Sequence, residues 1–327
     1  MDTTDWDLVY SKYHPLFEVM GNEPYSVWVK TWKELTYSLL DHHLVIRIKR
    51  SSTDSTLTLK PGLDEVRKRE YYHDADPNRD MEWLNILSGC NRLVDTVSTV
   101  IKDSSWIPPT TRLFYSGIID QEIAYFHIPS FSELSLDTIM AFEHFKYLVA
   151  NENIKACVID VRDNNGGNSA NLKSLLSCFT NEPVLIGYSR TKLGIGRDDL
   201  SMKIPAVVEP SINSQKREMP IVILANIFSQ SMAEVTVIAL RHLPQCYMIG
   251  ERTYGATGGS ADYLVDKEGN GFSIRTAQLF FEDVDGTVYE GHGVEPDVEC
   301  LFDQSAWNNG VDNQLECAVG FLKTKIN

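Results

Sequence analysis

The sequence predicts an α/β fold in which a mostly parallel sheet is covered by helices. After residue 110, short apolar segments typical of buried strands alternate with longer segments that carry a helical apolar period. The strand segments are apolar at consecutive positions rather than at alternate ones, which is typical of parallel strands buried on both faces. Together these patterns indicate repeated strand–helix units around one central sheet.

The elements of this region are expected in the following order. Strands are expected over residues 112–118, 123–128, 156–161, 183–188, 219–225 and 246–250, and helices over 136–150, 169–179, 231–242 and 311–323. In the first of these helices, Ile139, Phe142 and Phe145 share one apolar face. Residues 261–289 are rich in strand-forming residues, and residues 189–218 form either a lid or an ordinary surface segment.

The first 110 residues have a different pattern and are expected to form a mostly helical domain with a short hairpin. Two helix patterns occupy residues 4–42, strands are expected over 43–50 and 55–59, the charged stretch 61–82 is expected to be an exposed connection, and a further helix is expected over 81–101. Paired prolines at positions 108 and 109 stop helix and strand alike. We therefore expect an N-terminal domain over residues 1–110 and a core domain over residues 111–327.

Composition excludes several classes of function. The net charge of -15 argues against binding to nucleic acid, whose phosphates need basic surfaces. No apolar run is long enough to cross a membrane as a helix. The six cysteines show no C-x-x-C spacing, so we expect neither a zinc site nor a cofactor.

The first residues, Met-Asp-Thr-Thr-Asp-Trp, contain neither a basic segment nor an apolar core, so they do not predict a signal peptide. The chain begins close to its first helix pattern. We therefore expect an exported protein, periplasmic or on the cell surface, whose leader is absent from this chain. A cytoplasmic location stays open.

The segment A-N-I-F-S-Q-S-M-A-E, residues 225–234, connects an expected buried strand to an expected helix. A serine in such a turn has its own N–H group and a helix N-terminus beside it, and both favour negative charge. A nucleophilic serine needs this environment, because attack on a carbonyl creates an oxyanion nearby. The alternative is that Ser229 or Ser231 only caps the helix.

Three further segments flank the serine turn along the sequence, one before it and two after it. They are D-V-R-D-N-N-G-G at 160–167, G-E-R-T-Y-G at 250–255 and G-H-G-V-E-P-D at 291–297. With the serine turn they resemble the tail-specific, or C-terminal processing, serine peptidase family over roughly residues 112–302. The resemblance implies a stacked ββα core like that of crotonases and the Clp protease, and hydrolysis of peptide bonds in a peptide or an unfolded protein.

The resemblance also implies roles for individual residues. Ser231 is the expected nucleophile, because it stands three residues before Glu234 as in the family's S-x-x-E. The expected oxyanion hole combines the N–H group of Met232 with that of Gly166 or Gly167, although the two glycines could also form a plain loop. Ser229 and Glu234 are expected to support the site.

One departure from the family pattern bears on the mechanism. The processing branch has a lysine base after the glycine of G-E-x-T-x-G, and this position is Ala256. The tricorn-like branch draws a histidine from an N-terminal helix-to-strand junction that often contains D-G-H. Here the matching residues are D-H-H at 41–43, so His43 is the expected general base, and His42 is a candidate supporting residue. Glu290 matches the glutamate that orients the site in that branch.

Several alternatives stay open. The paired histidines could instead complement a helix dipole, Glu290 could be a surface carboxylate, and His292 is a rival base. Because the lysine is missing, the chain could be a catalytically inactive protein that binds a small lipophilic or peptide ligand. A crotonase-like acyl-thioester enzyme is a third possibility, but it would leave the serine turn without a task. Residues 51–110 do not show the pattern of a PDZ domain.

Overall fold

The computed structural model describes residues 6–37, 39, 41–48, 56–74, 76, 79–89, 93–103, 110–132, 135–194, 199–211, 214, 216–264 and 272–326. The helices are α1 (Trp6–Val19), α2 (Tyr25–Thr36), α3 (Pro61–Val66), α4 (Arg79–Gly89), α5 (Leu136–Ala150), α6 (Ala170–Leu176), α7 (Met232–Arg241), α8 (Gln304–Asn308) and α9 (Asn313–Ile326). The strands are β1 (Val45–Ile48), β2 (Leu57–Leu59), β3 (Leu93–Asp103), β4 (Thr110–Ile119), β5 (Ile123–His127), β6 (Ala156–Asp160), β7 (Val184–Thr191), β8 (Ile204–Val208), β9 (Ile221–Ala225), β10 (Cys246–Gly250), β11 (Ser260–Leu264), β12 (Ser273–Ala277), β13 (Leu279–Glu282) and β14 (Val298–Glu299).

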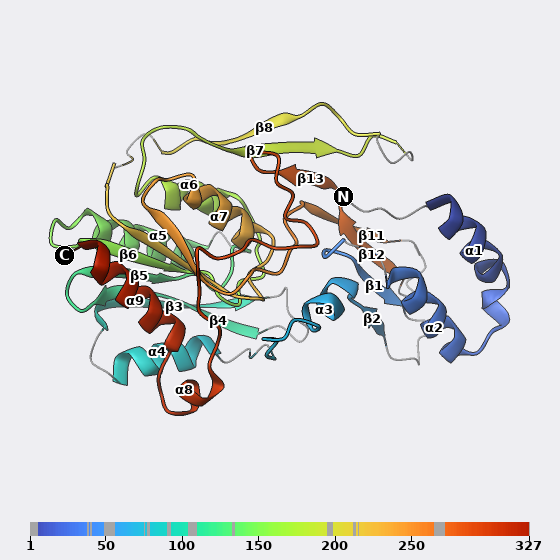
Figure 1. Cartoon of the computed structure of the whole chain (residues 1–327), viewed down its shortest axis with the longest axis horizontal. Helices are drawn as coiled ribbons and strands as arrows, with labels where there is room; N and C mark the ends of the chain where they lie inside the picture. Colours follow the sequence, from blue (N-terminus) through green and yellow to red (C-terminus); the bar gives the residue numbers. More distant parts are fainter. Residues whose placement is uncertain are drawn as a thin grey trace.

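A seven-stranded sheet in the order β14-β10-β9-β6-β5-β4-β3 forms the core of the larger part of the molecule, on the left in Figure 1. The pairs from β14 to β5 are parallel, and β5, β4 and β3 continue the sheet with antiparallel pairs. The predicted α/β fold with a mostly parallel central sheet is thus confirmed. The strands β5, β6 and β9 are buried at every position, which explains their continuous apolar sequences.

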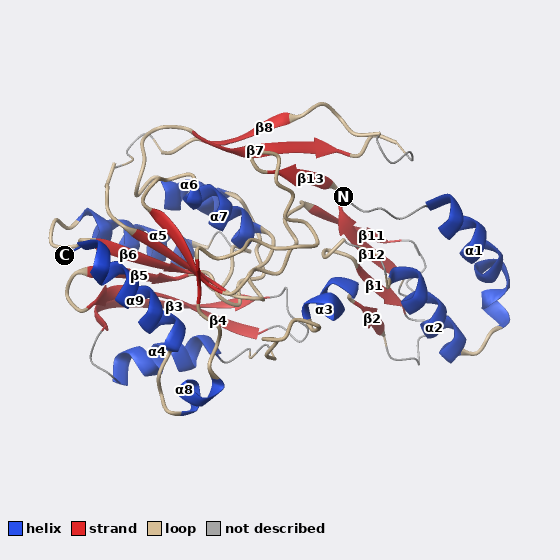
Figure 2. Cartoon of the chain, in the orientation of Figure 1, coloured by secondary structure: helices blue, strands red, loops and turns tan. Residues whose placement is uncertain are grey.

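Helices cover both faces of this sheet (Figure 2). Side chains of α5, α6 and α7 share one apolar cluster with one set of strand residues, for example Phe126 and Ile223. Side chains of α4 and α9 share a second cluster with the alternate strand residues, for example Tyr125 and Val222. Because successive side chains of a strand point to opposite faces, each strand contributes to both clusters.

A four-stranded antiparallel sheet pairs strands from the N-terminal region with strands from residues 260–277. Its order is β11-β12-β1-β2, so the N-terminal strand β1 pairs with β12, with Ile46 opposite Ile274. The helix α2 lies beside this sheet, and its Trp28 and Trp32 pack against a small apolar cluster that includes Ile46 (Figure 1). Pairing of β1 with β12 therefore fixes the position of the histidines that precede β1.

The structure contradicts two predictions about the N-terminal region. The helix expected over residues 81–101 ends at Gly89, and Leu93–Asp103 form strand β3 instead. The reason is local, because the sequence from Val94 to Ile101 is rich in valine, threonine and isoleucine, which disfavour a helix and suit a strand. The charged stretch over 61–82 contains α3 and the start of α4.

The proposed domain boundary at residue 110 stays a prediction, and its prolines lie outside the described residues. The sheets pair across this position, since β3 before it pairs with β4 after it, and β1 pairs with β12. The segment 189–218 contains β8, which pairs with β7 in a three-stranded sheet of order β13-β7-β8. Among the described residues, no helix is long and apolar enough to cross a membrane.

Candidate active site

The serine turn lies between β9 and α7 and holds Ser231 in a backbone conformation that non-glycine residues rarely adopt. Ser231 has φ 57° and ψ −120°. Such a conformation costs on the order of 1–3 kcal/mol, and it persists where the surrounding structure enforces it, often at functional sites. Ser231 immediately precedes α7, and it is half-buried beside the N-terminus of that helix. The turn thus presents a serine hydroxyl at the end of a buried strand.

Ser229 holds this turn in place. Its hydroxyl donates to the carbonyl of Val161 at 2.8 Å and accepts from the N–H group of Asn226 at 3.0 Å. The residue has no exposed surface. Its hydroxyl is therefore engaged in joining β9 to the end of β6, and Ser231 is the better candidate for a nucleophile.

Gly166, in the turn after β6, lies directly against the serine turn. Its φ is +88°, and a Cβ added to it would lie 2.7 Å from the nitrogen of Met232 and 2.6 Å from the Cβ of Ser231. Only glycine fits this position. The missing Cβ leaves space beside the nitrogen of Met232 and the Cβ of Ser231.

The neighbouring N–H groups distinguish the two glycines. The N–H group of Gly166 donates to the Asn164 side chain at 2.8 Å. Gly167, with φ +136°, packs against the backbone of Phe131, and this bridge uses the Gly166 carbonyl and the Asn168 N–H group. The N–H group of Gly167 thus takes no part in the bridge. The N–H group of Gly166 is therefore engaged with Asn164, whereas the backbone bridge to Phe131 leaves the N–H group of Gly167 unused.

The carboxylate of Glu234 ties the serine turn to the loop that follows β10. It accepts from the Ser231 N–H group at 3.1 Å and from the N–H groups of Gly255 and Ala256, each at 2.7 Å. It also accepts from the Thr253 hydroxyl at 2.5 Å. Burial raises the pKa of Glu234 to about 7, although the four donors act in the opposite direction. Ala256 is itself fully buried, and its backbone supports this contact.

His43, which precedes β1, lies beside Glu290, which is in the loop before β14 and contacts the loop that follows β10. The Nδ1 atom of His43 is 3.9 Å from Oε2 of Glu290, and that oxygen accepts from the N–H group of Gly258 at 2.9 Å. Oε1 of Glu290 accepts from the N–H group of His42 at 3.1 Å. Glu290 is therefore a largely buried, hydrogen-bonded carboxyl group, and the alternative of a surface carboxylate is wrong. The loop 255–258 thus contacts both halves of the predicted site, Ser231 through Glu234 and His43 through Glu290.

Burial disfavours charge on both members of this pair. It lowers the pKa of His43 to about 4, although the nearby Asp41 carboxylate acts in the opposite direction. It raises the pKa of Glu290 to about 8, and repulsion from Asp41 and Glu234 adds to this shift. A neutral imidazole is the form that accepts a proton, so burial keeps His43 in the state that a general base requires.

His42 has a supporting position. Its Nδ1 atom is 2.9 Å from the carbonyl of Tyr254, and because a carbonyl only accepts, Nδ1 carries the proton. Its other ring nitrogen, Nε2, is buried without a hydrogen-bond partner among the described residues. Burial lowers the pKa of His42. The His42 ring thus fixes the N-terminal region to the 252–255 loop rather than facing Glu290.

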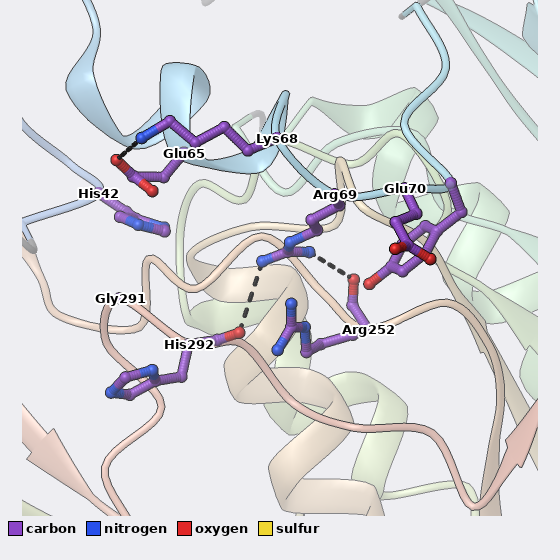
Figure 3. A pocket seen from close by; sticks show the side chains of 9 residues that line it. His42, Glu65, Lys68, Arg69, Glu70, Arg252, Gly291 and His292 are labelled. Atoms are coloured by element: carbon purple, nitrogen blue, oxygen red, sulfur yellow. Dashed lines mark hydrogen bonds and ion pairs between the residues drawn. The ribbon is translucent and has the colours of Figure 1, made fainter.

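A polar pocket of about 510 Å³ adjoins His42 (Figure 3). In its wall, the guanidinium of Arg69 donates to the carbonyls of Arg252, Thr253, Tyr254 and His292. Lys68 pairs with Glu65 at 2.5 Å, and the rival base His292 is exposed on the opposite side (Figure 3). Arg69 therefore holds the 252–254 loop to the loop that carries Glu290.

A buried ionic network lies next to the turn after β6 that contains Gly166 and Gly167. Arg162 pairs with Asp160 at 2.6 Å and with Asp312 at 2.8 Å, and neither Arg162 nor Asp160 has exposed surface. Asp163 continues the network by accepting from the Asn226 side chain at 2.7 Å, which connects the turn after β6 to the turn after β9.

Three contributing residues were not predicted from the sequence. Asp41 belongs to the D-H-H segment, and its carboxylate accepts from the N–H group of His43 at 2.9 Å. Arg69 lies in a charged stretch that looked like an exposed connection, and nothing in its neighbours distinguishes it. Asn164 lies in the motif before the glycines, where an Asx turn is a recognisable signal.

The chain is similar in sequence to known peptidases. Residues 122–300 match the profile described as Peptidase family S41. The chain is 24% identical over 181 residues to a carboxy-terminal-processing protease of Bartonella bacilliformis, which covers 55% of this chain and 39% of that protein. It is 23% identical over 222 residues to the tricorn protease of Thermoplasma acidophilum, which covers 68% of this chain and 18% of that protein. The chain thus spans well under half the length of these relatives.

A solved structure from Parabacteroides merdae, described as that of a candidate peptidase, covers 98% of this chain and 90% of its own. The TM-score is 0.72 and the sequence identity is 25%. The similarity extends over the N-terminal region as well as the core, because nearly the whole chain is matched.

Proposed function

Since the chain belongs to peptidase family S41, we propose that it is a serine peptidase in which Ser231 is the nucleophile, His43 is the general base and Glu290 orients His43. The single observation that carries the proposal is the strained conformation of Ser231, with Gly166 packed so that the adjacent Met232 N–H group stays open. Ser231 and Glu234 form a capping box at the start of α7, but capping alone does not account for this combination, because an ordinary cap has β-region dihedrals. The alternative of simple capping is therefore less well supported.

The proposed reaction has two halves. In the first, the Ser231 oxygen forms a bond to the carbonyl carbon of a peptide, and His43 takes the hydroxyl proton. The N–H groups of Met232 and Gly167 hold the oxyanion, and the C–N bond then breaks as His43 returns the proton to the leaving amine. In the second half, a water molecule attacks the acyl group with the same base, which releases the acid and restores Ser231.

The catalytically inactive alternative receives less support. The pocket beside His42 is lined by charged side chains such as Lys68, Arg69 and Glu70, which do not suit a small lipophilic ligand (Figure 3). Ala256 replaces only the lysine of one branch, and His43 offers a base from another segment. We propose a peptide or an unfolded segment as the substrate, and an exported location remains a prediction.

Labelling with a fluorophosphonate probe tests the assignment of the nucleophile. We expect the wild type to be labelled and Ser231→Ala to be unlabelled, because the probe reacts with an activated serine. Equal labelling of the two proteins would remove Ser231 from the mechanism. Failure to label the folded wild type would favour the inactive alternative.

The rate of labelling tests the base. His43→Ala is expected to react at least about 1,000-fold more slowly, which is the usual scale for loss of a catalytic base. His292→Ala is the matched control, because this histidine is two residues beyond Glu290 but is exposed, and it is expected to react at the rate of the wild type. If the His292→Ala protein is labelled slowly and the His43→Ala protein is labelled at the wild-type rate, then His292 and not His43 is the general base.

A further inference from the structure

Asp41, His43 and Glu290 form a compact cluster of metal-ligand types. One ligand atom from each residue can be chosen so that all three atoms lie within 4.8 Å of one another. His43 is 8% exposed, and the Glu290 side chain is 19% exposed. The three residues come from the segment before β1 and from the loop before β14, so only the folded chain assembles them.

The imidazole of His43 is aimed into this cluster without a partner. Its Nδ1 atom is buried, and it has no hydrogen-bond partner among the described residues, although it is 3.9 Å from Oε2 of Glu290. A buried polar atom without a partner is costly, and it is uncommon in native proteins. Among the side chains that the structure describes, no lysine or arginine forms an ion pair with Asp41 or Glu290. Two carboxyl groups and an imidazole nitrogen thus converge, while Arg275, whose charge acts on His43, forms its ion pair with Asp262.

The backbone around the cluster already orients both carboxylates. Oδ1 of Asp41 accepts one hydrogen bond, from the N–H group of His43. Oδ2 accepts from the Thr276 hydroxyl at 2.6 Å and from the Ala277 N–H group at 2.9 Å, both on β12. A carboxylate oxygen has two acceptor positions, so Oδ1 retains one.

Glu290 is held in the same way. Each of its oxygens accepts one backbone hydrogen bond, from His42 and from Gly258, and each retains one acceptor position. Hydrogen bonds of this kind, made to the ligand groups from behind, orient metal ligands and are part of a metal site. The cluster therefore has both the ligand atoms and their supports.

We propose that Asp41, His43 and Glu290 bind a divalent transition cation of the zinc class. One imidazole nitrogen and two carboxylate oxygens suit Zn²⁺ and its neighbours, whereas Mg²⁺ and Ca²⁺ prefer oxygen ligands alone. An ion at about 2.1 Å from three ligand atoms in tetrahedral geometry requires these atoms to lie about 3.4 Å from one another. The cluster must therefore close by up to about 1.4 Å when the ion binds. This site uses no cysteine, so the absence of C-x-x-C spacing does not argue against it.

The consequence for catalysis rests on the proposed function. Neutral imidazole has one lone pair on nitrogen and one N–H group. When Nδ1 binds a metal through its lone pair, the proton lies on Nε2, and Nε2 cannot accept the proton of Ser231. A bound ion would also take up the Glu290 oxygen that orients His43. The cation is therefore an inhibitor that holds the base in the wrong tautomer.

Competition with a chromogenic chelator measures Zn²⁺ affinity without any use of activity. We expect Asp41→Asn, His43→Ala and Glu290→Gln to bind Zn²⁺ at least about tenfold more weakly than the wild type, since even groups behind the ligands affect affinity that much. Glu290→Gln keeps one carbonyl oxygen, which can accept from the N–H group of His42 or of Gly258 but not from both, because the amide nitrogen only donates. Thermal unfolding therefore checks that this variant is folded. Ser231→Ala and the exposed His292→Ala are the matched controls and should bind like the wild type.

Two results would overturn the site. Unchanged affinity in the three ligand variants would place the ion elsewhere, and an equal loss in His292→Ala would place it in the pocket beside His42. Substitution of Co²⁺ adds a check, because the absorption bands of cobalt–thiolate bonds would show that cysteines bind the ion instead.

Labelling of Ser231 with and without Zn²⁺ tests the inhibition. We expect saturating Zn²⁺ to slow fluorophosphonate labelling of the wild type by at least about tenfold, and a chelator to restore it. Zinc that binds at the three ligands but leaves labelling unchanged would overturn the inhibitory role. If the metal-free wild type is never labelled, the proposed peptidase function fails, while the affinity measurements still decide whether the metal site exists.

Discussion

At the scale of single residues, the main feature of the predicted site is the contact between Ser231, whose backbone is strained, and Gly166, whose backbone is not. Ser231 adopts a positive φ despite its Cβ, and Gly166 adopts one that its missing Cβ permits. The two residues touch, because a Cβ on Gly166 would lie 2.6 Å from that of Ser231. The serine hydroxyl and the Met232 N–H group therefore share a space that one added methyl group would fill.

Gly166→Ala is expected to slow fluorophosphonate labelling about 100- to 1,000-fold, which is the usual cost of losing one oxyanion donor. The added methyl group would crowd both the Met232 N–H group and the Cβ of Ser231. Gly286→Ala is the matched control, because Gly286 has nearly the same φ, +87°, and its added Cβ would meet nothing within 4 Å.

Both alanine variants should lose about 1–2 kcal/mol of unfolding free energy from the backbone conformation. Only Gly166→Ala should lose labelling. A Gly166→Ala protein that is folded and labelled at the wild-type rate would exclude the proposed oxyanion hole. Thermal unfolding, followed by circular dichroism, gives the stability of each variant.

At the scale of elements, one carboxylate joins helix α7 to the loop after β10. Glu234, in the first turn of α7, receives hydrogen bonds from the helix start and from the 253–256 loop. The same loop is held by Arg69 and His42 from the N-terminal region. Helix α7, the 253–256 loop and the N-terminal region are thus connected through a few backbone hydrogen bonds. We expect that loss of any of these bonds moves the predicted site residues.

Glu234 gives this junction a predictable dependence on pH. Its pKa in the folded chain is about 7, above the ordinary value of 4.5, so the folded state binds more protons than the unfolded state between these values. The stability from this carboxyl group is complete below about pH 4.5 and is lost as the pH rises through about 7. The difference in unfolding free energy between wild type and Glu234→Gln, which cannot titrate, should fall over this window by about 1–3 kcal/mol.

Urea unfolding of both proteins at several pH values measures this difference. A difference that rises with pH would show that the four hydrogen-bond donors outweigh burial, and that the pKa of Glu234 is lowered in the folded chain. Thr58→Val, a substitution of an exposed residue on β2, serves as a control for general effects of pH.

At the scale of the whole molecule, the predicted site lies between two separately packed regions. The seven-stranded sheet and its helices have large apolar clusters of their own, whereas the four-stranded sheet has a small cluster that includes Leu44, Ile46 and Leu59. His43 belongs to the small region and Ser231 to the large one. Small clusters open at lower free energy than large cores.

In the Ile46→Ala protein, fluorophosphonate labelling of Ser231 should therefore be lost before the seven-stranded sheet unfolds. The substitution removes a side chain that is 2% exposed, and we expect it to destabilise the four-stranded sheet by about 2–5 kcal/mol. Labelling should be lost at a lower urea concentration than in the wild type, while the central sheet unfolds at its usual midpoint.

Ile223→Ala, in β9 of the central sheet, is the counterpart and should lower the midpoint of the main unfolding transition. Far-UV circular dichroism and the rate of labelling, followed in the same urea series, distinguish the two regions. If labelling and circular dichroism change together in Ile46→Ala, the molecule unfolds as one unit and the two regions are not independent.

The sequence was informative wherever neighbours along the chain decide the structure. The helix expected over 136–150 agrees with α5, and the strand expected over 246–250 agrees with β10, because an amphipathic period and a buried apolar run are local properties. The helix expected over 81–101 was wrong in its second half, where β-branched residues favour pairing with β4. Pairing with a distant strand is not visible in a local period.

The sequence by itself determined the α/β core, the serine turn with its glycines and the identity of a candidate histidine, because each depends on a short run of residues. Only the tertiary structure decided that Glu290 lies against the His42 N–H group across 248 positions of the chain, that Gly166 rather than Gly167 packs over Met232, and that Asp41 completes a cluster with His43. The physical reason is that such contacts depend on how the sheets and loops pack together, and packing joins residues that have no relation along the sequence.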